Sequence, residues 1–317
     1  MSHTPVLLHE VIEYLNPQPG KFIIDGTIGG GGHAVGIFKE ILPNGRVLGV
    51  DLDISSLERA REKISTEIKN PSFVPLSGTS AGRQKSNIKN NLILVSGNYA
   101  DIPKILKTKQ LPKADGLLLD LGFSSDQLRG SGRGFSFDPA AENEPLIMTY
   151  GDDREPVRNL LRKTKEYELE GILKKFGDER FAKRIARAIV SRERKKPIET
   201  AGELAAIVEA AVPGIYERGR IHPATRTFQA LRIYANDELG NLERVLNELS
   251  EILDSQGRVA VISFHSLEDR IVKHTFRDLE RQHILKIMTK KPVTASPEEM
   301  RENPRNRSAK LRAAEIM

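Results

Sequence analysis

Short apolar runs, several of them ending in aspartate, recur through the first 125 residues and restrict the possible fold more than any other feature. The predicted strands among them are residues 22–25, 47–51, 92–95 and 116–120. Helical patterns occupy residues 34–41 and 55–68 in between. Because strand and helix signals alternate, the sequence predicts an α/β fold in which helices cover a parallel sheet.

The pattern changes in the middle of the chain. Residues 130–217 contain several helical stretches and no convincing strand, and the α/β pattern resumes at His222. We therefore expect a discontinuous α/β domain made of residues 1–129 and 218–317. Residues 130–217 are expected to form an inserted helical domain, a candidate region for RNA or substrate recognition.

The clearest helix of the expected insertion spans residues 181–190 and has one apolar and one basic side. The basic side carries Arg180, Lys183, Arg184 and Arg187 without interleaved acids. Such a side is either a solvated charged surface or a surface that faces phosphates, and the sequence leaves both open. The last 37 residues add nine Lys and Arg against four Glu, so most of the net charge of +6 lies in the tail.

Four elements are expected after the insertion. A helix is predicted through Ala235, and a second amphipathic helix is predicted to run through Leu253 and to end at Gly257. Residues 258–264 are predicted to form a strand, and a final strand is expected within the basic tail.

The composition excludes several classes of site. The chain has no cysteine, which rules out disulfides, thiolate zinc sites, iron–sulfur clusters and a cysteine nucleophile. None of the seven histidines pair at the short spacing of a metal site, so no metal is expected. No apolar run approaches the length of a membrane span, and the first residues lack a secretory signal pattern. A cytoplasmic, metal-free protein is expected.

A glycine-dense turn, residues 26–32, follows the first predicted strand. Gly29, Gly31 and Ala34 match the loose spacing of a nucleotide-binding turn, and Asp51 lies about 20 residues further on, where an acid accepts hydrogen bonds from a ribose. Glycines at such a turn let the backbone approach a ligand closely. This pattern alone is shared by nicotinamide enzymes and by methyltransferases that use S-adenosyl-L-methionine (AdoMet).

The acids favour AdoMet over a dinucleotide. Asp25, Asp51 and Asp120 all fall at the carboxyl ends of predicted parallel strands, the edge at which such sheets bind ligands. Asp25 directly precedes the turn that would hold a pyrophosphate, and two anions at close range repel. AdoMet instead carries an ammonium and a sulfonium. The alternative is that one of these aspartates caps a turn, and Asp25 is expected to lie furthest from the ligand.

The end of the fourth predicted strand suggests the acceptor. Asp120 lies three residues before Phe123, as in methyltransferases that act on amines, where the acid binds an exocyclic amine and the ring stacks on a base. The absence of cysteine argues against carbon-5 methylation of cytosine, which needs a cysteine adduct. Direct attack by an amine requires alignment alone. The alternative is that Asp120 merely ends a strand and Phe123 lies in the core.

Other residues could serve the acceptor. Phe123, Phe135, Phe137 and Phe264 are candidates for stacking on a base turned out of folded RNA, with core packing as the alternative for each. Residues 263–270 form a dense polar cluster that could position substrate or relay a proton. The alternative for this segment is a helix N-terminus capped by Ser266, with Asp269 at the third helical position.

Several segments resemble one known family. They are residues 3–8, 25–33, 118–125, 133–137, 181–189, 222–230, 263–270, 303–305 and 307–308. Together they resemble the ribosomal RNA small subunit (cytosine-N4)-methyltransferase H family, also called MraW-like, across nearly the whole chain.

The resemblance implies a Rossmann-like class I AdoMet methyltransferase domain with an inserted helical domain. It further implies methylation of the exocyclic N4 of one cytosine in 16S (small-subunit) rRNA near the decoding centre, with the small ribosomal subunit as partner. Matching the family's cofactor positions residue by residue gives Gly31, Gly32, His33, Asp51, Tyr99, Asp120 and Gln127. Asp120 is also the candidate for orienting the acceptor amine.

Two departures from the family pattern stand out. Residues 145–150 lack the acid and the arginine that the family usually has there, and the polar loop at residues 77–91 is longer than expected. The first departure leaves open a non-catalytic rRNA-binding assembly factor. A nicotinamide oxidoreductase is the remaining alternative, which Asp25 disfavours.

Overall fold

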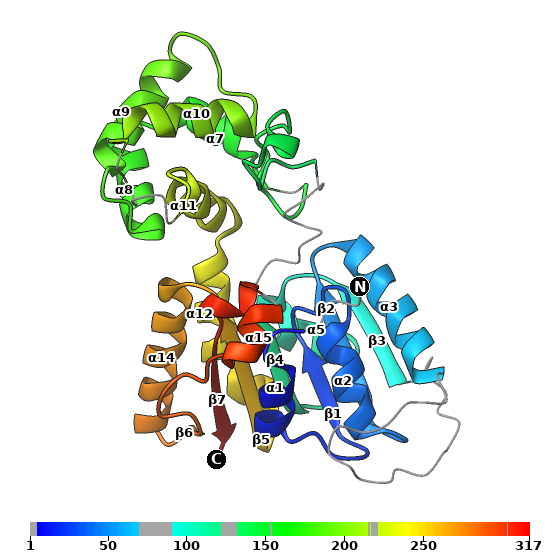
Figure 1. Cartoon of the computed structure of the whole chain (residues 1–317). Helices are drawn as coiled ribbons and strands as arrows, with labels where there is room; N and C mark the ends of the chain where they lie inside the picture. The colour runs from blue at the N-terminus through cyan, green and yellow to red at the C-terminus, as the bar shows by residue number, and fades with distance from the viewer. Residues whose placement is uncertain are drawn as a thin grey trace. The chain divides into compact units, whose positions relative to one another are not determined.

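The protein was analysed as a computed structural model, which describes residues 5–69, 91–121, 132–152, 154–214, 216, 221–302 and 304–317 (Figure 1). The chain divides into two compact units. The first comprises Met1–Gly122 and Leu239–Met317, and the second comprises Phe123–Glu238.

A seven-stranded sheet forms the centre of the first unit, in the order β3-β2-β1-β4-β5-β7-β6. Its strands are β1 (Phe22–Asp25), β2 (Arg46–Asp51), β3 (Leu92–Ser96), β4 (Ala114–Asp120), β5 (Leu253–Ser263), β6 (Leu285–Ile287) and β7 (Lys310–Ile316). Strands β1 to β5 are parallel, and β7 lies antiparallel between β5 and β6. The expected parallel sheet is confirmed. The strand order reverses between β1 and β4, the position at which open α/β sheets bind ligands.

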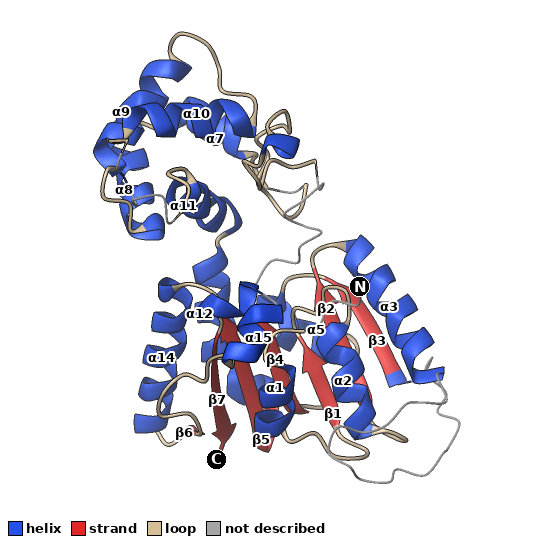
Figure 2. Cartoon of the chain, viewed as in Figure 1, coloured by secondary structure: helices blue, strands red, loops and turns tan. Residues whose placement is uncertain are grey.

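Helices cover both faces of this sheet (Figure 2). The helical elements of the unit are α1 (Leu8–Leu15), α2 (Gly32–Ile41), α3 (Ile54–Lys69), the 3-10 helix η1 (Tyr99–Asp101), α5 (Ile102–Thr108), α12 (Glu238–Asn247), α13 (Leu249–Ile252), α14 (Ser266–Arg281), α15 (Pro297–Glu302) and the 3-10 helix η4 (Pro304–Ser308). One core joins the sheet to α1, α2 and α3 through Val11, Ile37 and Ile64. The core on the opposite face includes Ile102 of α5 and Val272 of α14. Burial of these apolar faces stabilises the layers.

The start of β5 differs from the expectation. The predicted helix through Leu253 ends instead at Ile252, and Leu253 pairs with Ala114 in the sheet. Gly257, expected to end the helix, lies within β5, where a Cβ would come within 2.8 Å of the Asp254 carbonyl oxygen. The pairing shifts register here, so the residues between 253 and 258 form an irregular stretch. An apolar residue at position 253 suits both periodicities, and pairing with β4 decides between them.

The second unit is helical. It contains the 3-10 helix η2 (Pro139–Ala141), α7 (Val157–Lys163), α8 (Glu166–Gly177), α9 (Ala182–Glu193), α10 (Ala201–Ala211) and α11 (Thr225–Asn236). Helix α9 buries Ala182, Ile185, Ala186 and Ile189, which confirms the predicted apolar side. Within the described part of this unit there is no named strand, although Pro145 and Thr200 form an isolated bridge.

This unit ends later than residue 217, the expected boundary. Phe228 and Leu231 of α11 are buried in the same core as α8 and α9, and the unit extends to Glu238. The periodicity of α11 resembles that of a helix that covers a sheet, so the sequence did not show which core it joins. The earlier boundary, expected at residue 129, falls within residues 122–131, outside the described part of the chain.

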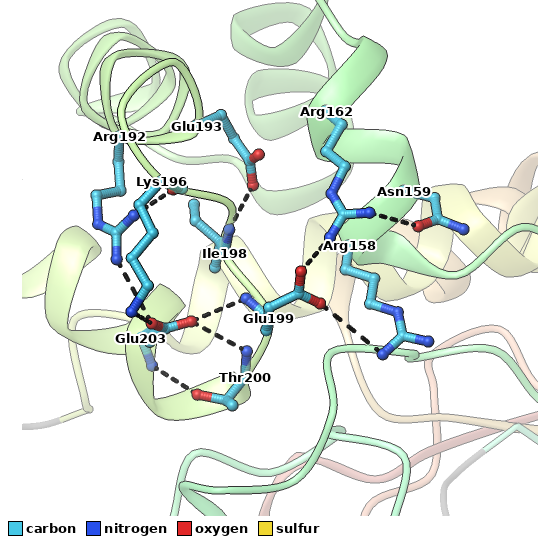
Figure 3. A network of polar contacts seen from close by, with 10 residues as sticks. All are labelled: Arg158, Asn159, Arg162, Arg192, Glu193, Lys196, Ile198, Glu199, Thr200 and Glu203. Carbon is cyan, nitrogen blue, oxygen red and sulfur yellow. Dashed lines mark hydrogen bonds and ion pairs between the residues drawn. The ribbon is translucent and has the colours of Figure 1, made fainter.

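A polar network ties three segments of the helical unit together (Figure 3). Arg158 and Arg162 of α7 both pair with Glu199. Arg192 of α9 and the following Lys196 lie 3.4 and 3.6 Å from the Glu203 carboxylate. Ion pairs as exposed as these contribute little individually.

Glu203 of this network also lies in the first turn of α10, which begins at Ala201. It forms a reciprocal capping box with Thr200, in which each side chain accepts a backbone hydrogen bond from the other residue. The network therefore fixes the entry into α10.

Candidate functional site

Three carboxylates lie at the carboxyl edge of the sheet, as the sequence predicts. Asp25, Asp51 and Asp120 end β1, β2 and β4, which are neighbours in the sheet order. Burial, together with the charges of Asp120 and Asp51, raises the pKa of Asp25 to about 8, against a hydrogen bond from Thr27 that lowers it. Burial also raises the pKa of Asp51. A cation bound at this edge would therefore favour the ionised form of both acids.

A backbone hydrogen bond joins the turn after β1 to the side chain of Asp51. The backbone N–H of Gly29 donates to one carboxylate oxygen of Asp51 across 2.9 Å, and the N–H of Asp53 donates to the other across the same distance. Gly29 has a φ of 49°, a left-handed conformation that glycine adopts without a steric penalty. These bonds fix the orientation of the Asp51 carboxylate, and each oxygen has a second lone pair for a ribose hydroxyl.

Thr27 joins the two central strands at this edge. Its backbone N–H donates to Asp25 across 3.2 Å, and its hydroxyl accepts the backbone N–H of Asp120 across 2.7 Å. Sequence reasoning assigned Thr27 no role. The only available signal was its position in the Asp25-Gly26-Thr27 segment, which does not reveal a partner 93 residues away.

Neighbouring residues pack closely against the predicted glycines Gly31 and Gly32. A Cβ on Gly31 would come within 3.0 Å of the Ala60 Cα in α3, and one on Gly32 would come within 2.8 Å of Pro5. Gly31 also has a φ of 77°. By contrast, a Cβ on Gly30 would meet nothing within 4 Å. Close packing explains Gly31 and Gly32, while the open space beside the turn is at Gly30.

His33, the second residue of α2, is brought next to Asp120. The imidazole is buried, and its Nε2 lies 2.8 Å from the backbone carbonyl oxygen of Val6. Its Nδ1 lies 3.6 Å from Oδ2 of Asp120, whose side chain is about one-fifth exposed at 22%. His33 is therefore the more buried member of this pair, and Asp120 is the more exposed one.

Tyr99 begins the 3-10 helix η1, just after β3. It packs against the core, and a Cβ on Gly26 would lie 3.3 Å from the Tyr99 Cβ. The structure therefore brings Tyr99 to the turn that also carries Gly31, Gly32 and His33. The remaining predicted site residue, Gln127, lies outside the described residues, as does Phe123.

The other stacking candidates have partners of their own. The Phe135 ring stacks on Tyr150 at 5.6 Å within the helical core, and the Phe137 ring stacks on His222 at 4.4 Å. Phe264 packs against the core on the α1–α3 side of the sheet. Core packing, the stated alternative, describes Phe135, and Phe137 and Phe264 are partly buried against the two cores.

The polar cluster at residues 263–270 forms a helix N-terminus, but with different residues from those expected. His265 caps α14 instead of Ser266, and Glu268 occupies the third helical position instead of Asp269. Glu268 accepts the N–H of Phe264 across 2.8 Å. The side chain of Asp269 pairs with Arg312 at 2.7 Å on β7. The contact to β7 diverts Asp269 from capping.

Residues 145–150, which differ from the usual family pattern, are part of the helical unit. Leu146 and Met148 are buried in its core. Asn236 donates to the Met148 carbonyl oxygen across 2.8 Å and accepts the N–H of Tyr150 across 2.9 Å. The segment therefore has a packing role that does not depend on the missing acid and arginine.

The residues at the sheet edge fit AdoMet. The cofactor supplies two positive charges, and three carboxylates converge where it would lie. Asp51 is oriented with acceptor capacity left for a ribose, and the turn offers open space at Gly30. A pyrophosphate at this turn would disfavour the ionised form of the buried Asp25 further, whereas a cation would favour that form.

This combination of strand order, antiparallel β7 and acidic sheet edge defines a class I AdoMet-dependent methyltransferase. A family model described as the MraW methylase family matches residues 1–317, and the chain belongs to that family. The expected family and the methyl donor AdoMet are thereby confirmed, and the nicotinamide alternative is excluded.

Two sequence relatives support the same family. A protein of Syntrophus aciditrophicus is 41% identical, with 99% of this chain and 97% of the relative covered. A protein of Deinococcus deserti is 46% identical, with 99% and 93% covered. Both are named ribosomal RNA small subunit methyltransferase H. A solved rRNA methylase of Streptococcus thermophilus is 10% identical, with a TM-score of 0.41 and 100% of this chain and 99% of that chain covered.

No helix in the described part of the chain combines the length and apolar character needed to cross a membrane.

Proposed function

We propose that this protein transfers the methyl group of AdoMet to the exocyclic N4 amine of one cytosine in 16S rRNA, near the decoding centre. The relatives' names support small-subunit rRNA as the substrate. The observation that carries the choice of an amine is Asp120, an acid at the end of β4 on the ligand-binding edge. The proposed place of action is the cytoplasm, on the small ribosomal subunit.

The cofactor site in this proposal consists of residues around the turn and at the ends of β2, β3 and β4. They are Gly31, Gly32, His33, Asp51, Tyr99, Asp120 and Gln127. Asp51 binds the ribose hydroxyls through its fixed carboxylate. Tyr99 would hold the adenine. The buried Asp25, with its pKa raised to about 8, would be ionised at neutral pH only where a bound cation favours its charged form.

The chemistry in this proposal is a direct displacement. The cofactor supplies a methyl group bound to a positively charged sulfur, which is a good leaving group. Asp120 accepts a hydrogen bond from the acceptor amine and holds its nitrogen lone pair in line with the methyl group. Thr27 fixes the backbone of Asp120 through its hydroxyl, so the carboxylate keeps its direction. Alignment of two bound reactants supplies most of the rate in such a step.

The rRNA contacts are proposed to lie on the helical unit and the basic tail. Arg180, Lys183 and Arg184 are exposed on or beside α9, and each adds positive charge that attracts phosphates. Arg187 of the same helix pairs with Glu166 at 3.3 Å, which lowers its share of the attraction.

The test uses AdoMet with a labelled methyl group and small ribosomal subunits that lack the modification. The proposal expects one methyl group per subunit, located by mass spectrometry on N4 of a cytosine near the decoding centre. Methyl transfer to carbon 5, to a ribose or to another base contradicts it. Tight binding without transfer indicates the non-catalytic assembly factor instead. Free 16S rRNA as a parallel substrate shows whether the assembled particle is required.

A further inference from the structure

The imidazole of His33 has a single arrangement of protons that suits its surroundings. Nε2 lies 2.8 Å from the Val6 carbonyl oxygen, which can only accept a hydrogen bond. The proton of the neutral ring must therefore be on Nε2. This leaves the lone pair on Nδ1, the nitrogen that faces Oδ2 of Asp120 across 3.6 Å.

The neutral form of the His33 ring is the state that matters for the reaction. His33 is the second residue of the ten-residue helix α2, and its side chain is buried. A neutral ring with a lone pair on Nδ1 is the form that can accept a proton.

One further proton can bind between Nδ1 of His33 and Oδ2 of Asp120. Two lone pairs that face each other across 3.6 Å are too far apart for a hydrogen bond and do not attract. A proton on Nδ1 would convert this arrangement into an ion pair, and the neighbouring carboxylate would compensate the buried imidazolium. Asp120 is the more exposed partner, at 22% against 7%, so it faces the ligand side of the pair.

We infer that His33 is a positioning residue that stores the proton released during methyl transfer. This inference rests on the proposed function, because it takes Asp120 as the group that binds the acceptor amine. The amine nitrogen forms a bond to the methyl carbon, and the carbon–sulfur bond breaks with its electron pair kept by sulfur. The methylated nitrogen, now positive, gives one proton to the Asp120 carboxylate, which passes it to Nδ1 of His33. The imidazolium later loses that proton to water.

The rate of transfer is expected to depend on pH through this pair. At low pH a proton already on Nδ1 blocks the acceptor, so the maximal rate falls on the acid side. Other titratable groups lie at the same sheet edge, at the ends of β1 and β2. They are Asp25 and Asp51.

The first experiment observes His33 directly, in the full-length ¹⁵N-labelled protein. Two-bond ¹H–¹⁵N correlation spectra distinguish a protonated ring nitrogen from an unprotonated one, and His33→Gln identifies the His33 signals by their loss. The expected result is a proton on Nε2, none on Nδ1 near neutral pH, and protonation of Nδ1 on acidification. A resting ring with its proton on Nδ1 overturns the inference, whether or not the variant folds.

The second experiment compares transfer with cofactor binding in His33→Gln. A glutamine amide can still donate to the Val6 carbonyl oxygen, but it cannot accept a proton. The expected result is a fall in kcat of about 100-fold, the size typical of lost acid–base assistance, with loss of the acid-side dependence. The Kd for AdoMet, measured by calorimetry, is expected to change much less than kcat, although His33 is one of the proposed cofactor-site residues. The control is His9→Gln, which alters an exposed histidine of α1 and should leave kcat unchanged.

The outcomes separate the inference from the proposed function. If wild-type kcat persists in His33→Gln, or only the Kd for AdoMet weakens, the inference is wrong. If the wild-type protein methylates a different acceptor, the proposed function fails. The NMR signals of His33 and the kcat of His33→Gln on that acceptor then still decide its role.

Discussion

The backbone N–H of Asp120 donates a 2.7 Å hydrogen bond to the hydroxyl of Thr27, a residue that lies 93 positions earlier in the chain. Thr27 also donates its own backbone N–H to Asp25. The ends of β1 and β4 are thus joined through one side chain, at the position where the strand order reverses. Hydrogen bonds between neighbouring strand ends therefore orient Asp25 and Asp120 at this edge.

Replacement of Thr27 tests this join. Thr27→Val removes the acceptor and keeps the shape, so the N–H of Asp120 loses its partner. The free energy of unfolding is expected to fall by up to about 1–3 kcal/mol, the range for a buried donor without a partner, because this donor is only partly buried. Thr27→Ser retains the hydroxyl and is the control. Denaturant titration measures both, and equal stability of the two variants would contradict the role assigned to the hydroxyl.

Replacement of Asp120 tests the orientation of the amine. Asp120→Asn keeps the size of the side chain and removes its charge, so kcat for methyl transfer is expected to fall at least about 100-fold. The Kd for AdoMet should rise much less. Labelled methyl transfer and calorimetry measure the two quantities. An equal loss of both would reduce Asp120 to a cofactor ligand.

The raised pKa of Asp25 predicts a pH-dependent stability. Between its ordinary value of 3.8 and about 8, Asp25 is protonated in the folded protein and ionised in the unfolded chain. The folded state then binds more protons, so the contribution of Asp25 to the free energy of unfolding decreases as pH rises through this window. Asp25→Asn lacks this decrease.

The measurement is the Tm of both proteins from pH 5 to pH 8 without cofactor. The difference between the Tm of Asp25→Asn and the Tm of the wild type should increase in favour of the variant as pH rises. Asp254→Asn, at an exposed position in β5, serves as the control and should show no such gain. Curves for Asp25→Asn and the wild type that stay parallel would show that Asp25 is ionised in the fold.

The two kinds of glycine in the turn should respond differently to alanine. Gly31→Ala places a Cβ within 3.0 Å of the Ala60 Cα and forces a φ of 77° on an L residue. The left-handed conformation alone costs about 1–2 kcal/mol. Gly30→Ala meets no atom within 4 Å and should change stability by less than about 0.5 kcal/mol. Thermal unfolding compares them, and equal effects would refute the packing explanation for Gly31.

The exposed cations beside α9 predict salt-sensitive binding. A double change, Arg180→Gln with Lys183→Gln, should weaken binding to the small ribosomal subunit at low salt. The slope of log affinity against log salt should flatten by about 0.7–0.9 for each phosphate that the variant no longer neutralises. Lys107→Gln, on α5 of the other unit, is the control. Filter binding across a salt series measures this, and an unchanged slope would exclude α9 from the RNA surface.

The sheet could be predicted because its information is local. Each strand from β1 to β4 is a short apolar run, and the acids at positions 25, 51 and 120 follow from where those runs stop. A helix N-terminus at residues 263–270 was the stated alternative to a substrate-positioning cluster, but with its capping box one residue too late. Ser266 and Asp269 satisfy the capping pattern as well as His265 and Glu268 do, and the choice depends on Arg312, which binds Asp269 from β7.

The sequence by itself determined the α/β class, the acidic sheet edge, the helical insertion and the exclusion of cysteine chemistry. Periodicity, strand ends and composition are properties of neighbouring residues. Only the tertiary structure decided that α11 joins the helical core, that Thr27 holds Asp120, and that the Val6 carbonyl fixes the ring of His33. These contacts join residues distant in sequence, and their partners are selected by the packing of whole elements.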